Sequence, residues 1–123
     1  MPSKNPEVPL RDILDNIRLA RSFVEGFNLR KFRTDTRTIY AVIRCLEIIS
    51  EASRRLPANL KSRHPDIPWK DIAGAGNVYR HDYEEISTVM IWNTVKALPD
   101  LLEVVEEELL RLSPTLARPK FHK

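Results

Sequence analysis

Residues 35–56 read DTRTIYAVIRCLEIISEASRRL, and this stretch decides the fold class. Its apolar residues recur at steps of three and four, which is the period of an amphipathic α-helix. Thr34 or Asp35 can cap the first turn and Pro57 ends the pattern, so we expect a helix over about 35–56. The side chains that we expect on its buried face are Ile39, Val42, Ile43, Leu46, Ile49 and Ala52.

Helical periodicity continues on both sides of this stretch. Residues 10–26 form a second amphipathic pattern, with Pro9 at its entry and with Gly26 and Asn28 as its stop signals. Residues 57–68 contain three prolines and predict a loop with at most a short helical turn. Further helices are expected over about 68–83 and from Ser87 or Thr88 to Leu98.

Pro99 is expected to break the last pattern and to start a fifth helix that ends near residue 112. The chain of 123 residues therefore predicts a single all-α domain, an up-and-down bundle of four to five helices with its core at about 10–112. Residues 113–123 hold two prolines and several basic residues, and we expect a mobile tail there.

Composition excludes several functional classes. The single cysteine, Cys45, allows no internal disulfide and no cysteine-rich zinc site, and it falls on the apolar side of its helix. No apolar run is long enough to span a membrane, and the N-terminus lacks the apolar core of a signal peptide. No glycine-rich phosphate loop occurs, and the three histidines are scattered. We therefore expect a cytoplasmic protein with no membrane contact, no metal and no cofactor.

Positive charge is concentrated in the N-terminal half of a chain whose net charge is +3. Residues 1–64 hold 13 Lys and Arg against 7 Asp and Glu, whereas residues 65–123 hold 7 against 10. Most of the basic residues in the first half are arginines, whose planar fork matches a phosphate group. This asymmetry suits an anionic partner, and it equally suits a solvated face with ordinary ion pairs.

Residues 76–83, GNVYRHDY, hold the densest cluster of reactive side chains. Asn77 lies one helical turn before His81, so the two share a face, and Tyr83 follows two residues later. His81 could exchange protons near neutral pH, and Arg80 could stabilise negative charge on a phosphorane. Such a set could cleave a phosphodiester without a metal. The alternative is that His81 and Tyr83 are structural residues in a helix crossing.

The other candidates are weaker. We expect His64 to be exposed in its loop, His122 to lie in the tail, and residues 106–108, three glutamates, to form a solvated face. Trp69 and Trp92 are expected to pack in the core rather than to stack on bases.

The segment 67–83, IPWKDIAGAGNVYRHDY, resembles the signature of HepT-like proteins, which belong to the superfamily of higher eukaryote and prokaryote nucleotide-binding (HEPN) domains. The resemblance extends over roughly 10–112 and includes residues 48–52, IISEA, and the later pairs Ile91-Trp92 and Leu98-Pro99. It implies a helical homodimer that acts as a metal-independent ribonuclease toxin. It also implies a minimal nucleotidyltransferase antitoxin as the partner and RNA as the substrate.

The resemblance also assigns roles to residues. The family motif is Arg, four residues, His, one residue, Tyr, which implies that His81 is catalytic and that Tyr83 is the tyrosine the antitoxin adenylylates. The polar residue after the motif arginine corresponds to Asn77. The arginine position itself is Gly76 here. Arg80 lies one turn later and leans toward the N-terminus on a helix, so it could supply the missing guanidinium.

Three interpretations remain open from the sequence. The first is an RNA-cleaving toxin of a two-component pair. The second is a catalytically weakened module that binds a nucleotidyltransferase or a nucleotide without cleaving RNA, as the loss of arginine at Gly76 suggests. The third is a plain dimerisation bundle, which leaves the polar cluster at 76–83 without a role.

Overall fold

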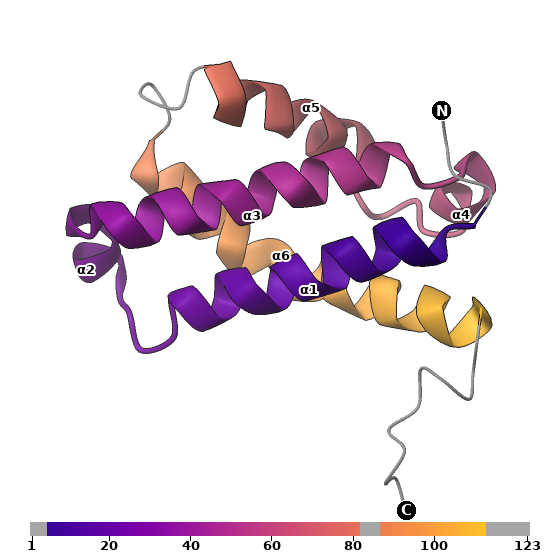
Figure 1. Cartoon of the computed structure of the whole chain (residues 1–123), viewed down its shortest axis with the longest axis horizontal. Coiled ribbons are helices and arrows are strands. Elements are labelled where there is room, and N and C mark those ends of the chain that lie inside the picture. Colours follow the sequence, from indigo (N-terminus) through magenta and orange to yellow (C-terminus); the bar gives the residue numbers. More distant parts are fainter. Residues whose placement is uncertain (1–4, 82–86, 113–123) are drawn as a thin grey trace, which may run out of the picture.

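The computed structural model describes residues 5–81 and 87–112, and of residues 78–81 it describes the backbone alone. Within these ranges the chain is helical and has no strand, which confirms the predicted all-α class (Figure 1). The helices are α1 (Glu7–Phe23), α2 (Leu29–Thr34), α3 (Thr36–Arg54), α4 (Ala58–Ser62), α5 (Trp69–His81) and α6 (Thr88–Leu112).

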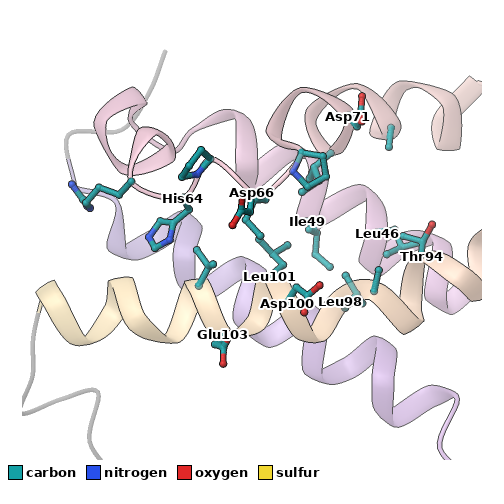
Figure 2. Close-up of a pocket in the computed structure, with 18 of the residues that line it drawn as sticks. Leu46, Ile49, His64, Asp66, Asp71, Thr94, Leu98, Asp100, Leu101 and Glu103 are labelled. Carbon is teal, nitrogen blue, oxygen red and sulfur yellow. The ribbon is translucent and has the colours of Figure 1, made fainter.

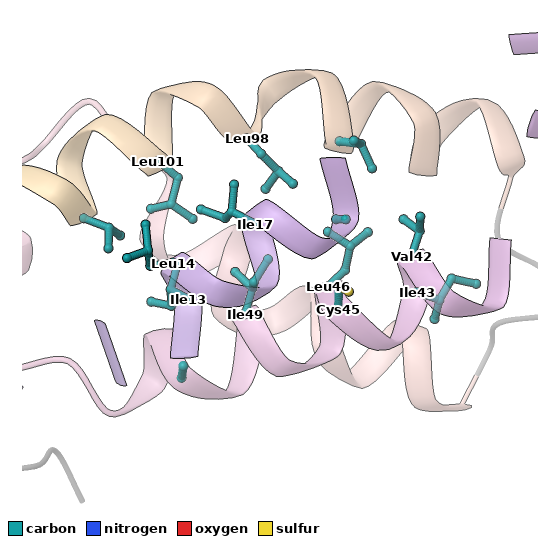
Figure 3. Close-up of a cluster of buried hydrophobic side chains, with 14 of the residues drawn as sticks. Ile13, Leu14, Ile17, Val42, Ile43, Cys45, Leu46, Ile49, Leu98 and Leu101 are labelled. Atoms are coloured by element: carbon teal, nitrogen blue, oxygen red, sulfur yellow. The ribbon is translucent and has the colours of Figure 1, made fainter. Parts of the chain in front are cut away.

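The core lies where α1, α3 and α6 meet, and α5 packs along α3 (Figure 1). Figure 3 shows side chains from these helices interdigitating, among them Ile17 of α1, Ile49 of α3 and Leu101 of α6. All six residues predicted for the buried face of 35–56 are buried. The three-four spacing therefore identified this face correctly, because a helix buries one stripe against its neighbours.

The ends of α1 differ from the prediction. The helix begins at Glu7, so Pro9 is its third residue and is buried rather than lying at the entry. A proline is tolerated there because its missing N–H is one of the first-turn groups that have no partner within a helix. The helix ends at Phe23, and Gly26 adopts a left-handed backbone (φ 80°) in the turn that follows.

Helix α2 was not predicted from the sequence. Asn28, read as a stop signal, instead caps α2 through its side chain, which accepts a hydrogen bond from the first-turn backbone. Phe32 is fully buried, and its ring lies 5.3 Å from that of Trp92 on α6. Asp35 then caps α3 in the same way. Six residues are too few to give a clear helical period, so this helix depends on one buried phenylalanine and one cap.

The predicted break at Pro99 is wrong, because α6 runs through it from Thr88 to Leu112. Pro99 is exposed, and Leu98 and Leu101 beside it are buried against the rest of the bundle. A proline inside a helix costs about 3 kcal/mol, since it removes the hydrogen bond to the carbonyl four residues earlier. Burial of the leucines on both sides offsets this cost, so the two predicted helices are one.

The loop before α5 is fixed by Trp69. Its indole N–H donates to the carbonyl oxygens of Lys61 and His64, at 3.2 and 3.0 Å. The short turn expected in 57–68 is α4, and both tryptophans pack as predicted. None of the helices in the described ranges combines the length and the apolar character that a membrane span requires.

Candidate functional site

Helix α5 carries the residues that the sequence singled out. Its backbone is helical from Trp69 to His81, so Gly76 and Arg80 are one turn apart, as are Asn77 and His81. Asn77 is exposed and Gly76 is buried. The side chains of Arg80 and His81, and Tyr83 altogether, lie outside the described residues.

A hydrogen-bond clamp, formed by Ser50 and Arg54 of α3, holds α5 in place. The Ser50 hydroxyl donates to the carbonyl oxygen of Ala73 at 3.0 Å and accepts from the backbone N–H of Gly76 at 2.9 Å. Arg54 donates to the same Ala73 carbonyl through Nε at 3.0 Å and Nη2 at 2.8 Å. These bonds fix the register and rotation of α5 on α3 two turns before His81.

Sequence reasoning did not assign roles to Ser50 and Arg54. Ser50 is a polar residue within the apolar stripe of α3, and it is 2% exposed. A buried hydroxyl without a partner is costly, so its position within the stripe was a signal for a contact with another helix. The sequence could not identify α5 as that helix, because the contact joins residues more than twenty positions apart.

Gly76 is buried where α5 passes Ser50. The resemblance seen in the sequence implies an arginine at this position. In this chain the Gly76 backbone is covered and its N–H is engaged by a neighbouring helix. Any positive charge near His81 must therefore come from another residue.

A groove of about 920 Å³ separates α5 from α6 (Figure 2). Its floor is apolar and includes Ile49 and Leu98, whereas carboxylates lie on both sides. Asp66 and Asp71 come from the α5 side, and Asp100 and Glu103 from α6. We refer to this feature as the α5–α6 groove. Its acidic sides make it unsuited to a phosphate backbone.

The glutamate run does not form a solvated face throughout, because Glu108 is 1% exposed. Arg63 donates to both of its carboxylate oxygens, at 3.1 and 2.6 Å, and Nε2 of His64 lies 2.5 Å from Oε2. The prediction of an exposed His64 is therefore wrong: its side chain is 10% exposed. The buried carboxylate holds it there.

The charge of Glu108 is stabilised by its partners. Burial would raise the pKa of its carboxyl, but hydrogen bonds from Arg63 and His64, with their charges, outweigh this and lower it. His64, Glu107 and Glu108 are close enough to suggest a metal site. Both oxygens of Glu108 are already engaged and the Arg63 guanidinium lies beside them, so we assign the cluster a structural role.

Cys45 has the buried, structural character that the sequence predicted. It is 4% exposed, and burial raises the pKa of its thiol. A thiol kept protonated in the core is a poor nucleophile.

Some basic residues of the N-terminal half, residues 1–64, form ordinary ion pairs, as one of the two interpretations of the charge asymmetry predicted. The pairs that cross between elements are Arg18–Glu106, Arg55–Asp12 and Arg63–Glu108. Arg30, Arg33 and Arg37 are exposed, and within the described ranges they have no ion-pair partner. They lie on α2 and the start of α3, at the end of the bundle toward which α5 runs (Figure 1).

Comparison with known proteins agrees with the resemblance seen in the sequence. A family model described as ribonuclease HepT-like matches residues 13–108. A probable ribonuclease HepT of Thermococcus cleftensis is 39% identical over 87 residues, which is 71% of this chain and 79% of that protein. A putative RNase of Methanocaldococcus jannaschii is 34% identical over 108 residues, 87% of this chain and 89% of the relative.

A putative RNase of Caldanaerobacter subterraneus subsp. tengcongensis is 35% identical over 107 residues, covering 86% of this chain and 96% of that protein. No solved structure matches the chain significantly. The family model spans α3, α5 and most of α6, which are the elements that build the clamp and carry the polar cluster. This chain therefore belongs to the HepT-like ribonuclease family.

Proposed function

We propose that the protein is the toxin of a two-component pair and cleaves RNA without a metal. Family membership carries this proposal. It is supported by helix α5, which is continuous through His81 and has an exposed Asn77 one turn earlier. The exposed arginines Arg30, Arg33 and Arg37 supply positive charge at the same end of the bundle, where an RNA backbone could bind.

The chemistry requires a base, an acid and stabilisation of charge. In the proposed reaction a histidine removes the proton of a ribose 2′-OH, and the oxygen attacks the adjacent phosphorus. The bond to the 5′-oxygen breaks, and an acid returns a proton to that leaving oxygen. The products are a 2′,3′-cyclic phosphate and a 5′-OH end. His81 is assigned the proton transfer, Asn77 the positioning of the phosphate, and Arg80 the charge on the phosphorane.

The proposal includes a homodimer and a regulating partner. A two-fold axis would bring two copies of His81 together, so that one could act as base and the other as acid. The partner is a minimal nucleotidyltransferase antitoxin that silences the toxin by adenylylating Tyr83. The second candidate function, a weakened module that binds its partner without cleaving RNA, is favoured by the single observation that Gly76 replaces the motif arginine.

Cleavage of end-labelled RNA in excess EDTA tests the proposal. We expect the wild type to cleave and His81→Ala to lose 10²–10⁴-fold in rate, the usual contribution of a general acid or base. His122→Ala is the matched histidine control and should cleave as the wild type does. Arg80→Ala should lose about 10²–10³-fold, as for a group that stabilises charge.

The intact mass of the wild-type protein shows whether Tyr83 carries a covalent adenylate. If wild-type protein without this adenylate does not cleave RNA, the second candidate function is correct and Gly76 marks a loss of activity. If Arg80→Ala cleaves as fast as wild type while His81→Ala does not, the role assigned to Arg80 is wrong.

A further inference from the structure

The α5–α6 groove is an apolar surface without a described occupant. Helix α5 packs on α3, and the groove lies between α5 and α6 with Leu46 and Ile49 of α3 in its floor (Figure 2). Met90 of α6 lines it and is 50% exposed. A groove of about 920 Å³ with an apolar floor is large for a surface that binds only water, and such grooves accommodate peptide segments or ligands.

The charges that line the α5–α6 groove indicate what kind of segment could bind in it. Four carboxylates line the groove, Asp66, Asp71, Asp100 and Glu103, and in the described part of the chain none of them has an ion-pair partner. Among the described residues, the arginine that lines it, Arg63, is neutralised by Glu108. The groove therefore favours an occupant that combines apolar side chains with positive charge.

The chain itself contains such a segment. Residues 113–123 read SPTLARPKFHK, with three Lys and Arg, no acidic residue, and Leu116 and Phe121 as apolar side chains. They follow directly on α6, whose last residue is Leu112. Proline fixes its own φ, so Pro114 and Pro119 reduce the conformational entropy that the segment would lose on binding.

The length of this segment matches the groove. An extended polyproline-type chain advances about 3.1 Å per residue, and a helix about 1.5 Å. The chain must first reverse direction, and a tight turn takes about four residues. The remaining seven residues span about 22 Å in extended form, which equals about 14 residues of α6 and reaches back from Leu112 to about Leu98. This reach covers Glu103 and Asp100, so basic residues of the segment can lie beside acidic positions of the groove.

We infer that residues 113–123 bind in the α5–α6 groove of their own chain. Bound there, the segment would bridge α5 and α6 and support α5 on the side that α3 does not cover. This inference does not depend on RNA cleavage, so it can fail or hold independently of the proposed function.

A spin label on the segment tests the inference in the full chain. A nitroxide is attached at His122→Cys, while Cys45 remains unlabelled because it is buried and burial raises the pKa of its thiol. We expect paramagnetic loss of the amide signals around Thr94 and Ala97. The amides around Arg11 and Arg18, exposed residues of α1, should keep their intensity. Equal intensity at both sites would overturn the inference.

A charge exchange separates specific binding from a chance approach. Asp100→Lys with Glu103→Lys should restore the lost signals, and adding Arg118→Glu with Lys120→Glu should remove them again. The matched control is Asp15→Lys with Glu25→Lys, two exposed carboxylates of α1 and the turn after it, which should leave the signal loss unchanged. Persistence of the loss in Asp100→Lys with Glu103→Lys would exclude the proposed charge pairing.

Mixing distinguishes the chain's own segment from that of a second copy. Isotope-labelled protein without a nitroxide is mixed with unlabelled protein that carries one. Intensity that stays constant in the mixture supports binding within one chain. Signal loss around Thr94 in the mixture would contradict it and would show that the groove receives the segment of another copy.

Discussion

Ser50→Ala tests whether the clamp holds α5 on α3. The substitution removes a hydroxyl that makes two hydrogen bonds to the α5 backbone, one to the Ala73 carbonyl and one from the Gly76 N–H. The Ala73 carbonyl keeps its two bonds from Arg54. A neutral hydrogen bond contributes about 0.5–1.5 kcal/mol, so we expect a loss of about 1.5 kcal/mol for the two together.

Native-state hydrogen exchange measures this loss helix by helix. Helix α5 packs mainly on α3 alone, so it should open before the bundle unfolds. A loss of about 1.5 kcal/mol then speeds exchange of the α5 amides about tenfold, since 1.4 kcal/mol is a factor of ten. The amides of α1 between Ile13 and Ile17 should change far less.

Ser53→Ala is the matched control. Ser53 is also a fully buried serine of α3, but its hydroxyl donates to the carbonyl of Ser50 within the same helix, at 2.7 Å. It should leave the ratio of α5 to α1 exchange unchanged. If Ser50→Ala speeds exchange equally in both helices, or in neither, then Ser50 does not clamp α5 and the argument for it is refuted.

Three further predictions concern stability. Arg63→Ala leaves the buried Glu108 carboxylate short of two donors and should lower the free energy of unfolding more than Arg18→Ala does. Arg18→Ala removes an exposed pair and should cost less than about 0.5 kcal/mol by urea unfolding. The folded-state pKa of Glu108 lies below its ordinary value of 4.5, so the stability that its charge contributes is present above pH 4.5 and is lost as the pH falls through the folded pKa. When the free energy of unfolding is measured during acid titration, Glu108→Gln should lack this part of the decrease. Gly74→Ala should stabilise the protein by about 0.5–1 kcal/mol, since the added Cβ meets nothing within 4 Å. Gly26→Ala should destabilise the protein by about 1 kcal/mol, because the backbone there has φ 80°. Unfolding temperatures that shift in the same direction for both variants would contradict this prediction.

The long helices could be predicted from sequence because their burial is periodic. The buried face of α3 from Ile39 to Ala52 follows from spacing alone. The predicted helix ends were misplaced for a common reason. A stop signal depends on residues that are neighbours in sequence, whereas packing depends on residues from other parts of the chain. Pro99 is a strong local break, and the buried leucines beside it outweigh that signal.

The polar contacts could not be predicted, because each of them joins residues far apart in the chain. His64 and the third residue of a glutamate run look solvent-exposed in sequence, and they meet only when α6 packs beside the loop after α4. The Ser50 clamp has the same character. In both cases the sequence showed a polar residue next to an apolar stripe, which indicates a buried contact without naming its partner.

The clamp explains how position 76 can be a glycine while α5 keeps its place on α3. Every residue except proline has a backbone N–H, so the hydrogen bond from position 76 to the Ser50 hydroxyl requires no side chain there. The contact that fixes α5 is therefore made by α3 side chains to α5 backbone, and it does not require any particular side chain on α5. Under the proposed function, the side chains of α5 are then left to meet the demands of RNA chemistry, and we expect Arg80 rather than position 76 to supply the guanidinium.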